Sequence, residues 1–341
     1  MAYRGRFAPS PTGPMHLGNA RTALLAWLAA RAEGGRLVMR VEDLDRPRLR
    51  PGMEERILAE LRWLGLDWDE GPDAGGPAGP YRQSQRLPLY QAALARLQEA
   101  GVVYPCFCSR AEVARAAEAP HGPGEDGPRY PGTCRDLAEG ERRERSARRS
   151  PAWRLRVEAG EVTFDDGLHG PQAFDVAVQV GDFVVARADG VPAYQLAVVV
   201  DDAAMGVTDV VRGDDLLPST ARQILLYRAL GSAPPRFAHV PLVVGPDGRR
   251  LAKRHGALSL GELRRRGADP RRAVALLARL SGLAGTETSL APADLVAGFG
   301  LARIPRAPAR RSIDTSRLSR SISSSGMRAI GFPRKRRQEV L

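Results

Sequence analysis

Apolar residues along the first hundred positions follow two periods, one typical of strands and one typical of helices. Short apolar runs at 3–7 and 36–41 predict two buried strands. Alanines and leucines recur at helical spacing over 19–33, and amphipathic helical patterns follow over 52–64 and 87–100. This alternation of strands and helices is typical of a parallel sheet with crossover helices, so the predicted fold class is α/β.

The pattern changes after residue 100. A Gly/Pro-rich loop at 119–132 and an Arg/Glu run at 139–149 indicate a subdomain inserted into the α/β fold. The remaining pattern predicts strands at 153–157, 174–180, 183–187, 193–200, 209–211 and 238–244, and helices at 219–230, 259–266 and 270–280. From 302 onward the chain is rich in Arg, Ser and Pro without periodicity, and we expect disorder there.

These patterns divide the chain into five parts. We expect two halves of one α/β domain at 1–100 and 191–258, separated by an inserted subdomain at 101–190. A helical segment at 259–301 and a basic tail at 302–341 complete the chain.

Composition narrows the class of protein. Hydrophobic residues make up 43% of the 341 positions, which is enough for a sizeable core, and no apolar run approaches the ~20 residues of a membrane span. The first residues lack the apolar stretch of a signal peptide. We therefore expect a cytoplasmic protein without a membrane partner, and we take it to be a monomer.

The net charge of +12 does not by itself predict nucleic-acid binding. Residues 302–341 hold eleven of the basic side chains and only two acidic ones, so the rest of the chain is nearly neutral. Of the 51 basic residues only Lys253 and Lys335 are lysines. Lys253 is therefore a candidate for a task that requires a compact ammonium group, with chance survival as the alternative.

The turn before the first predicted helix has the features of a phosphate site. Pro14, His16 and Gly18 stand where free helix N–H groups and the positive end of the helix dipole would meet an anion. Gly18 would let a nucleotide approach the backbone closely, and His16 would hydrogen-bond a phosphate oxygen. The sequence G-x-x-x-x-G-K-[ST] does not occur, which excludes a P-loop.

Three segments together resemble one enzyme family. Residues 7–18 (FAPSPTGPMHLG) resemble the first signature of class I aminoacyl-tRNA synthetases, in the form found in members that activate glutamate or glutamine. Residues 40–46 (RVEDLDR) resemble the strand end that follows it, and 250–256 (RLAKRHG) resemble the second signature. The likeness covers about 3–300 and implies a Rossmann-like parallel sheet, an inserted zinc-containing subdomain and a short helical C-terminal part.

The resemblance implies an ATP-dependent ligase that activates L-glutamate and transfers it to RNA. Glu42 would hold the α-ammonium group of glutamate, and Arg212 would pair with its side-chain carboxylate. The glutamate site as a whole would comprise Arg6, Ala8, Ser10, Glu42, Tyr194 and Arg212. Outside the family pattern, the two arginines would be read as surface residues, Tyr194 as core, and Glu42 as a helix cap.

The same resemblance assigns the ATP site, where Mg²⁺ would accompany the nucleotide. His16 and Lys253 would be the catalytic residues, because they would stabilise the charge that develops on pyrophosphate. The full set would be Pro14, His16, Gly18, Asp215 and Lys253. The second signature departs from the family pattern at Ala252, which replaces its serine and would slow the reaction rather than end it.

All three cysteines lie close together in the sequence, which favours a metal site over a disulfide framework. In relatives that this chain resembles, a Cys-x-Cys…Tyr-x-x-x-Cys pattern holds one structural Zn²⁺, which implies Cys106, Cys108, Tyr130 and Cys134 as its ligands. His121 is an alternative fourth ligand. Three reduced structural cysteines without a metal are the other interpretation.

The acceptor of glutamate is the open point of the resemblance. Because recognisable helical sequence stops near residue 300, the chain resembles the shortened branch that loads glutamate onto queuosine in the anticodon of tRNA(Asp). The alternatives are a truncated glutamyl-tRNA synthetase that charges a tRNA 3′ end and a non-catalytic, zinc-containing RNA-binding relative. A small adenylate-forming ligase outside translation would have no reason to keep Glu42, Tyr194 and Arg212.

Overall fold

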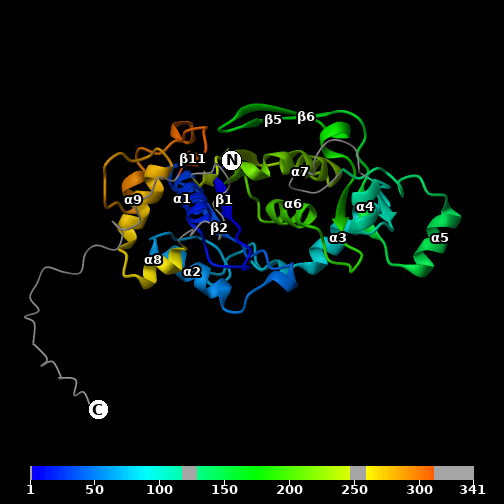
Figure 1. Cartoon of the computed structure of the whole chain (residues 1–341), viewed down its shortest axis with the longest axis horizontal. Helices are drawn as coiled ribbons and strands as arrows, with labels where there is room; N and C mark the ends of the chain where they lie inside the picture. Colours follow the sequence, from blue (N-terminus) through cyan, green and yellow to red (C-terminus); the bar gives the residue numbers. More distant parts are fainter. Residues whose placement is uncertain (1, 117–128, 246–258, 311–341) are drawn as a thin grey trace, which may run out of the picture.

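A six-stranded sheet forms the centre of the molecule (Figure 1). The computed structural model describes residues 2–116, 129–245 and 259–310. The strand order is β2-β1-β8-β9-β5-β6, and every pair is parallel except β5 and β6. The strands are β1 (Arg4–Phe7), β2 (Arg36–Met39), β8 (Asp209–Gly213), β9 (Arg236–Val240), β5 (Glu161–Asp166) and β6 (Gly170–Asp175).

Helices cover both faces of this sheet, as the α/β prediction requires. One face packs against α1 (Leu17–Ala32), α2 (Met53–Trp63), α8 (Leu260–Arg265) and α9 (Pro270–Leu280). The other packs against α3 (Leu87–Glu99), α6 (Tyr194–Ala204) and α7 (Leu217–Ala229). Successive residues of β8 serve the two sides, because Val210 belongs to one core cluster and Val211 to the other.

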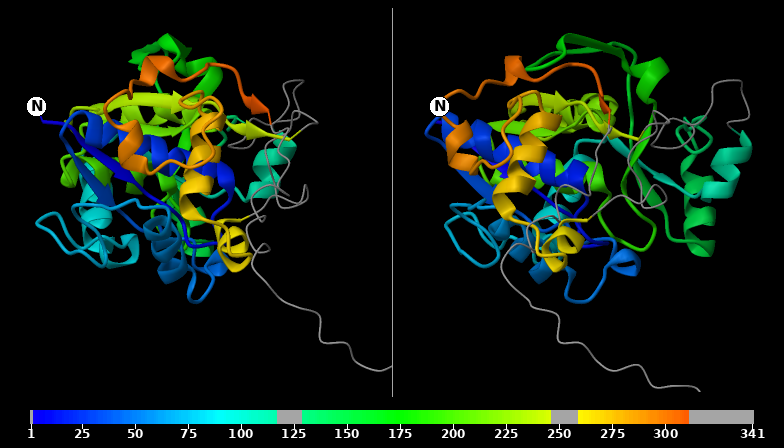
Figure 2. Two further views of the ribbon diagram at one scale, coloured as in Figure 1. Left: turned by 90° about the vertical axis from the view of Figure 1, so that its left-hand side faces the viewer. Right: turned by 60° about the vertical axis from the view of Figure 1, so that its left-hand side comes forward.

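A smaller antiparallel sheet lies at the far end of the molecule from α8 and α9 (Figures 1 and 2). It joins β3 (Val103–Cys106), β4 (Ala152–Leu155) and β7 (Phe183–Ala186), with α4 (Arg110–Ala116) and α5 (Glu139–Arg148) beside it. The predicted inserted part at 101–190 is not continuous in space, because β5 and β6 within it return to the main sheet. Short turns complete the described chain: η1 (Arg46–Arg48), η2 (Gln83–Gln85), η3 (Val176–Val180), η4 (Asp214–Leu216), η6 (Pro292–Leu295) and η7 (Leu301–Arg303).

Two predicted strands are wrong. Residues 193–200 begin helix α6, whose positions 195–199 are all buried. A helix surrounded by protein shows no polar face, so its apolar run imitates a buried strand. Residues 174–180 contain only the end of β6 and then the π-helical turn η3.

The described start of the C-terminal tail is ordered, which contradicts the predicted disorder for residues 302–310. Ile304 is only 2% exposed and joins the core. Strand β11 (Ala309–Arg310) pairs in parallel with β10 (Val243–Val244), and the Ala309 amide donates to the Leu242 carbonyl at 3.1 Å. The remainder, 311–341, lies outside the described residues.

The other predicted elements are confirmed to within a few residues, including the first strand, the helix that follows it, and the last helix at 270–280. Among the described residues, no helix is long and apolar enough to cross a membrane.

Candidate active site

The predicted glutamate residues gather at the carboxyl ends of the central parallel strands. Strand β1 lies between β2 and β8, so the connections run in opposite directions on its two sides. Open α/β sheets bind ligands at such a point. Arg6 lies at the end of β1, Glu42 follows β2, and Arg212 lies near the end of β8.

A buried network of opposite charges lies beneath this point. The Arg40 guanidinium is 0% exposed; its Nη1 lies 2.6 Å from Asp202 Oδ1, and its Nη2 lies 3.2 Å from Glu42 Oε1. Arg6 Nε approaches the same Asp202 oxygen at 3.5 Å. Burial raises the pKa of Glu42 although Arg40 and Arg6 oppose it. Burial would also raise the pKa of Asp202, but the two arginines outweigh it and lower that pKa.

The neighbouring Asp201 fixes the helix that carries Tyr194. Its carboxylate accepts hydrogen bonds from Gln83 Nε2 at 2.8 Å, Arg86 Nε at 2.6 Å and the Tyr90 hydroxyl at 2.9 Å. All four side chains are buried, and together they join α6 to α3 and to the turn before it. The position of Tyr194, the first residue of α6, therefore depends on this buried junction.

Arg212 is a buried cation whose hydrogen-bond acceptors are all neutral. It is 3% exposed and donates through Nε to His239 Nε2 at 2.9 Å, through Nη1 to Gln223 Oε1 at 2.8 Å and through Nη2 to Thr220 Oγ1 at 2.8 Å. A fourth, longer bond of 3.4 Å joins Nη2 to the Leu216 carbonyl. Burial lowers the pKa of Arg212. Within the described part of the chain, no carboxylate lies within ion-pair distance of this guanidinium.

The remaining glutamate candidates lie nearer the surface. Tyr194 is 40% exposed, while Ala8 is half-buried and Ser10 is exposed. The pKa of Tyr194 is raised, first by desolvation of its phenol and then by the charge of Glu42. An exposed aromatic ring among buried charges is suited to cover a ligand that those charges hold.

The nucleotide candidates lie at the start of α1, where Pro14 is half-buried and His16 is the residue before the first helical turn. The backbone of His16 pairs with that of Ser259, and the Leu260 amide donates to the Met15 carbonyl at 2.9 Å. The chain therefore returns to His16 directly after the segment 246–258. That segment, which contains Lys253 and Ala252, lies outside the described residues.

Gly18 and Gly213 differ in how much space surrounds their α-carbons. A Cβ added at Gly18 would meet no atom of the described chain within 4 Å, so internal packing does not require glycine there. A Cβ at Gly213 would instead collide with the Asp215 carboxylate and approach Leu242 to 3.3 Å. Gly213 therefore lets Asp215, in the turn η4, lie back over the end of β8.

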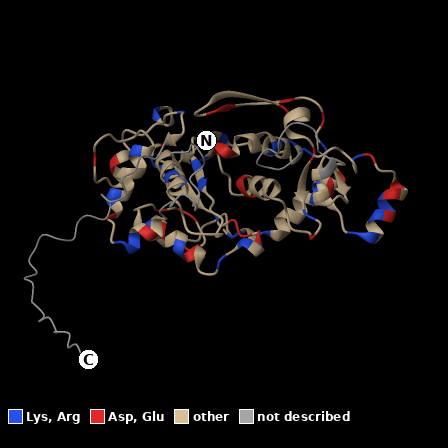
Figure 3. Cartoon of the chain, viewed as in Figure 1, with Lys and Arg blue, Asp and Glu red and all other residues tan. Residues whose placement is uncertain are grey.

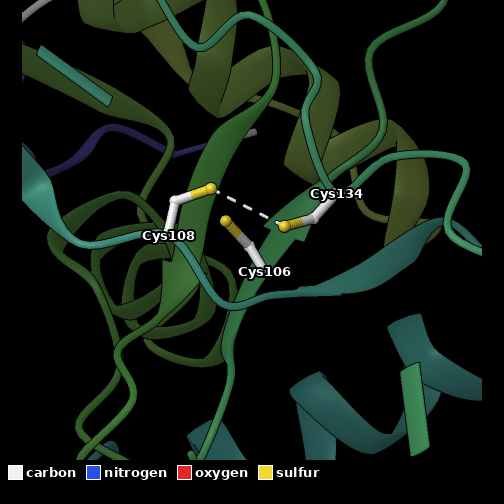
Figure 4. A group of neighbouring side chains, drawn as sticks. All are labelled: Cys106, Cys108 and Cys134. Carbon is white, nitrogen blue, oxygen red and sulfur yellow. Dashed lines mark hydrogen bonds between the residues drawn. The ribbon is translucent and has the colours of Figure 1, made fainter. Parts of the chain in front are cut away.

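The three cysteine sulfurs point toward one another in the smaller subdomain (Figure 4). All three lie within 4.8 Å, and Cys108 Sγ lies 3.6 Å from Cys134 Sγ. The Tyr130 hydroxyl is the fourth group, 3.3 Å from Cys106 Sγ and 3.5 Å from Cys108 Sγ. His121, the alternative ligand, lies outside the described residues.

This donor set fits a tetrahedral zinc ion. Zinc–sulfur bonds of about 2.3 Å place two tetrahedral thiolates about 3.8 Å apart, close to the observed sulfur separation. Burial raises the pKa of Cys108 to about 11, so a cation would have to displace its proton. Arg154 lies 3.8 Å above the Tyr130 ring, and Arg145 Nη1 lies 3.9 Å from Cys134 Sγ, which would balance the negative charge of the ligands.

Five site residues were not predicted from the sequence: Arg40, Asp166, Asp201, Asp202 and His239. Arg40 lies in the segment 40–46 that resembles the family, but the sequence assigns it no role of its own. Asp201 and Asp202 directly follow residues 193–200, which were wrongly predicted to form a strand. The arginines are also spread widely over the surface, notably on α5, α8 and α9 (Figure 3), so composition does not distinguish the buried ones.

Known proteins match this chain over most of its length. The model of the family described as tRNA synthetases class I (E and Q), catalytic domain, matches residues 2–294. A protein of Symbiobacterium thermophilum named glutamyl-Q tRNA(Asp) synthetase is 59% identical, over 91% of this chain and 96% of that protein. Glutamate–tRNA ligase 1 of Halorhodospira halophila is 49% identical, over 91% of this chain and 65% of that protein.

A solved structure gives the same likeness in three dimensions. The glutamate tRNA ligase from Elizabethkingia meningosepticum, determined in complex with its amino acid, superposes with a TM-score of 0.80 at 31% sequence identity. The superposition covers 91% of this chain and 67% of that one.

Proposed function

The chain belongs to the class I tRNA synthetases for glutamate and glutamine, and we propose that it activates L-glutamate with ATP and transfers it to queuosine in the anticodon of tRNA(Asp). Activation of an amino acid and its transfer to tRNA follow from the family. The identity of the amino acid rests on the charged site, and the identity of the acceptor rests on the relatives.

The buried charge of Arg212 is the observation that supports glutamate as the substrate. A buried guanidinium with only neutral acceptors favours a ligand that brings a negative charge. The side-chain carboxylate of glutamate would supply this charge, whereas the neutral amide of glutamine would not. Glu42, paired with Arg40, would hold the α-ammonium group, and Tyr194 would cover the ligand.

The reaction would proceed in two steps. An oxygen of the glutamate α-carboxylate attacks the α-phosphorus of ATP, the bond to the β-phosphate oxygen breaks, and pyrophosphate leaves. The acceptor hydroxyl then attacks the acyl carbon, loses its proton, and releases AMP. Amides at the start of α1, together with His16 and Lys253, would stabilise the charge that develops on the phosphates. Mg²⁺ would enter with ATP.

The zinc site would have a structural role. Cys106, Cys108, Tyr130 and Cys134 would hold the ion, which would join the β3 end to the segment before α5. Four protein ligands would leave no open position for a substrate.

The degree of likeness to the relatives favours queuosine over a tRNA 3′ end. The identity to a protein named glutamyl-Q tRNA(Asp) synthetase is 59%, whereas the identity to a glutamate–tRNA ligase is 49%. A cavity of about 260 Å³ also lies beside the candidate site, lined by Asp43, Tyr90, Pro192 and Leu196 among others. Asp43 follows Glu42, and Pro192 and Leu196 flank Tyr194 in sequence, so an acceptor of either kind in this cavity would lie near the activated carboxyl group.

Pyrophosphate exchange tests the first step. We expect exchange of labelled pyrophosphate into ATP that depends on glutamate, and we expect Lys253→Ala to reduce it greatly. Lys335→Ala is the matched control, since it removes the only other lysine of the chain. Absence of exchange in the wild type would favour the non-catalytic alternative.

Mapping of the labelled product tests the second step. After reaction with labelled glutamate, RNase digestion of tRNA(Asp) should place the label on the anticodon fragment. A matched tRNA(Asp) with unmodified guanosine at that position should stay unlabelled. Label on the 3′-terminal adenosine would instead identify a glutamyl-tRNA synthetase.

A further inference from the structure

A line of hydrogen-bonded side chains crosses three neighbouring strands behind the glutamate site. Asp166 ends β5, His239 lies in β9 and Arg212 lies in β8, and the sheet register places Arg212 directly opposite His239. His239 Nδ1 lies 2.6 Å from Asp166 Oδ2, and its Nε2 lies 2.9 Å from Arg212 Nε. All three residues are buried.

The geometry fixes the protonation state of His239. The Nε of an arginine always carries its proton in proteins, so Nε2 of His239 must accept and cannot be protonated. The single ring proton therefore resides on Nδ1, from which it is donated to Asp166. Burial lowers the pKa of His239 to about 4, so the ring is neutral at physiological pH and adds no second positive charge beside Arg212.

Asp166 is itself held in one orientation. Its Oδ1 accepts from the amides of Leu168 and His169, each at 2.9 Å, while its Oδ2 accepts from the His239 ring at 2.6 Å and from the His239 backbone amide at 3.1 Å. The carboxylate thus accepts the hydrogen bond of the ring N–H with one oxygen and is fixed by the adjoining turn with the other.

These contacts limit how Arg212 can be oriented. His239 holds Nε, Gln223 holds Nη1, and Thr220 holds Nη2. Of the five N–H groups of a guanidinium, one on Nη1 then has no acceptor in the described part of the chain. A substrate carboxylate would supply that missing acceptor. Arg6 is a second buried cation of the site, although its Nε lies 3.5 Å from Asp202 Oδ1 without forming a hydrogen bond.

We propose that Asp166 and His239 are positioning residues, which hold the Arg212 guanidinium in the orientation that receives the side-chain carboxylate of the substrate. This inference rests on the proposed function for the identity of that substrate. It assigns to two buried residues a specificity role that acts entirely through the tautomer of one imidazole ring.

Asp166→Asn is the sharpest test because it changes one oxygen to an NH2 group. Asn Oδ1 can keep the amides of Leu168 and His169 and the 3.3 Å contact from the His239 amide, which places Nδ2 opposite His239 Nδ1. The amide then donates to Nδ1, the ring proton moves to Nε2, and two N–H groups face each other at Arg212. We expect the KM for glutamate in pyrophosphate exchange to rise at least about tenfold. The kcat and the KM for ATP should change by less than about threefold.

A matched pair at His239 covers the case in which Asp166→Asn does not fold. The Oε1 of His239→Gln can take the place of Nε2, so its KM for glutamate should stay within about threefold of wild type. The shorter His239→Asn cannot reach Arg212 and should raise that KM about tenfold. Equal KM values for the two variants would overturn the proposal.

The ring tautomer gives a second measurement that does not depend on activity. The ¹⁵N signals of the His239 ring can be assigned because they are absent from the spectrum of His239→Gln. Their chemical shifts should show a protonated Nδ1 and an unprotonated Nε2. A protonated Nε2 in the wild type would overturn the proposal. Absence of glutamate-dependent exchange in the wild type would instead contradict the proposed function. The tautomer of His239 would still test the hydrogen bonds from Asp166 through His239 to Arg212.

Discussion

Arg212→Gln provides the most direct test of how the site recognises an acidic substrate. The substitution replaces a buried guanidinium with a neutral amide that is too short to reach the same ligand. Removing one partner of a buried, hydrogen-bonded charge pair costs about 2–5 kcal/mol. At about 3 kcal/mol, the KM for glutamate rises on the order of 100-fold.

Glutamine provides the internal comparison. Its side chain would offer Arg212 only a neutral carbonyl oxygen, and a bond of that kind contributes about 1 kcal/mol, or roughly fivefold in KM. The preference for glutamate over glutamine should therefore fall by about 20-fold in Arg212→Gln. The kcat should change little, because the contact lies away from the reacting carboxyl group.

The assay is pyrophosphate exchange at varied glutamate and glutamine concentrations. Arg96→Gln is the matched control, since it removes the same charge from an exposed position on α3. A KM for glutamate that stays within threefold of wild type would refute the reasoning. So would an equal rise for both amino acids, because the charge of Arg212 would then not be what distinguishes them.

Three further predictions test other parts of the molecule. Gly18→Ala should stabilise α1 by about 0.5–1 kcal/mol in thermal unfolding and yet raise the KM for ATP severalfold, and an unchanged KM would show that no nucleotide approaches there. Cys134→Ser should lower the zinc content measured by mass spectrometry and the melting temperature together, whereas wild-type protein without zinc would contradict the metal site. Because the pKa of His239 is about 4 in the folded state and about 6.5 when unfolded, the unfolded chain binds the proton first as pH falls. About 3 kcal/mol of stability present above pH 6.5 should be lost toward pH 4, and urea unfolding should show a smaller loss in His239→Gln.

The sequence predicts the order of elements well where a segment has one buried face and one exposed face. Helix α3 buries only Tyr90, Ala93 and Leu97, which lie on one face, and its predicted bounds of 87–100 differ from the observed ones by one residue. The prediction for helix α6 was wrong because protein surrounds most of the helix. Its sequence therefore lacks the polar stripe that would reveal a period of 3.6 residues. Strand β10 lies at the end of the predicted strand 238–244, but its pairing with β11 was not predicted because each strand has only two residues and they are more than sixty positions apart.

The residues of the candidate site likewise fall into a predicted group and a group that was not predicted. Residues that would touch the substrate, such as Arg6, Glu42 and Arg212, are predicted through the resemblance to a known family. Apart from Arg40, the residues that hold them lie outside the segments that resemble the family, because the contacts are made between elements that are neighbours in space but distant in sequence. Asp166 and His239 are 73 positions apart, and the strand that ends at Asp166 was not predicted at all.

The neutral surroundings of Arg212 explain why an uncharged imidazole suits this position. Arg40 has carboxylates of the protein within 2.6–3.5 Å, so its charge is already balanced before a ligand arrives. A carboxylate in place of His239 would balance Arg212 in the same way, and the substrate would have to compete with it. Asp166 instead lies one ring further away, close enough to orient His239 but outside ion-pair distance of the guanidinium. The charge of Arg212 therefore remains available to the substrate, at the cost of some stability in the empty enzyme.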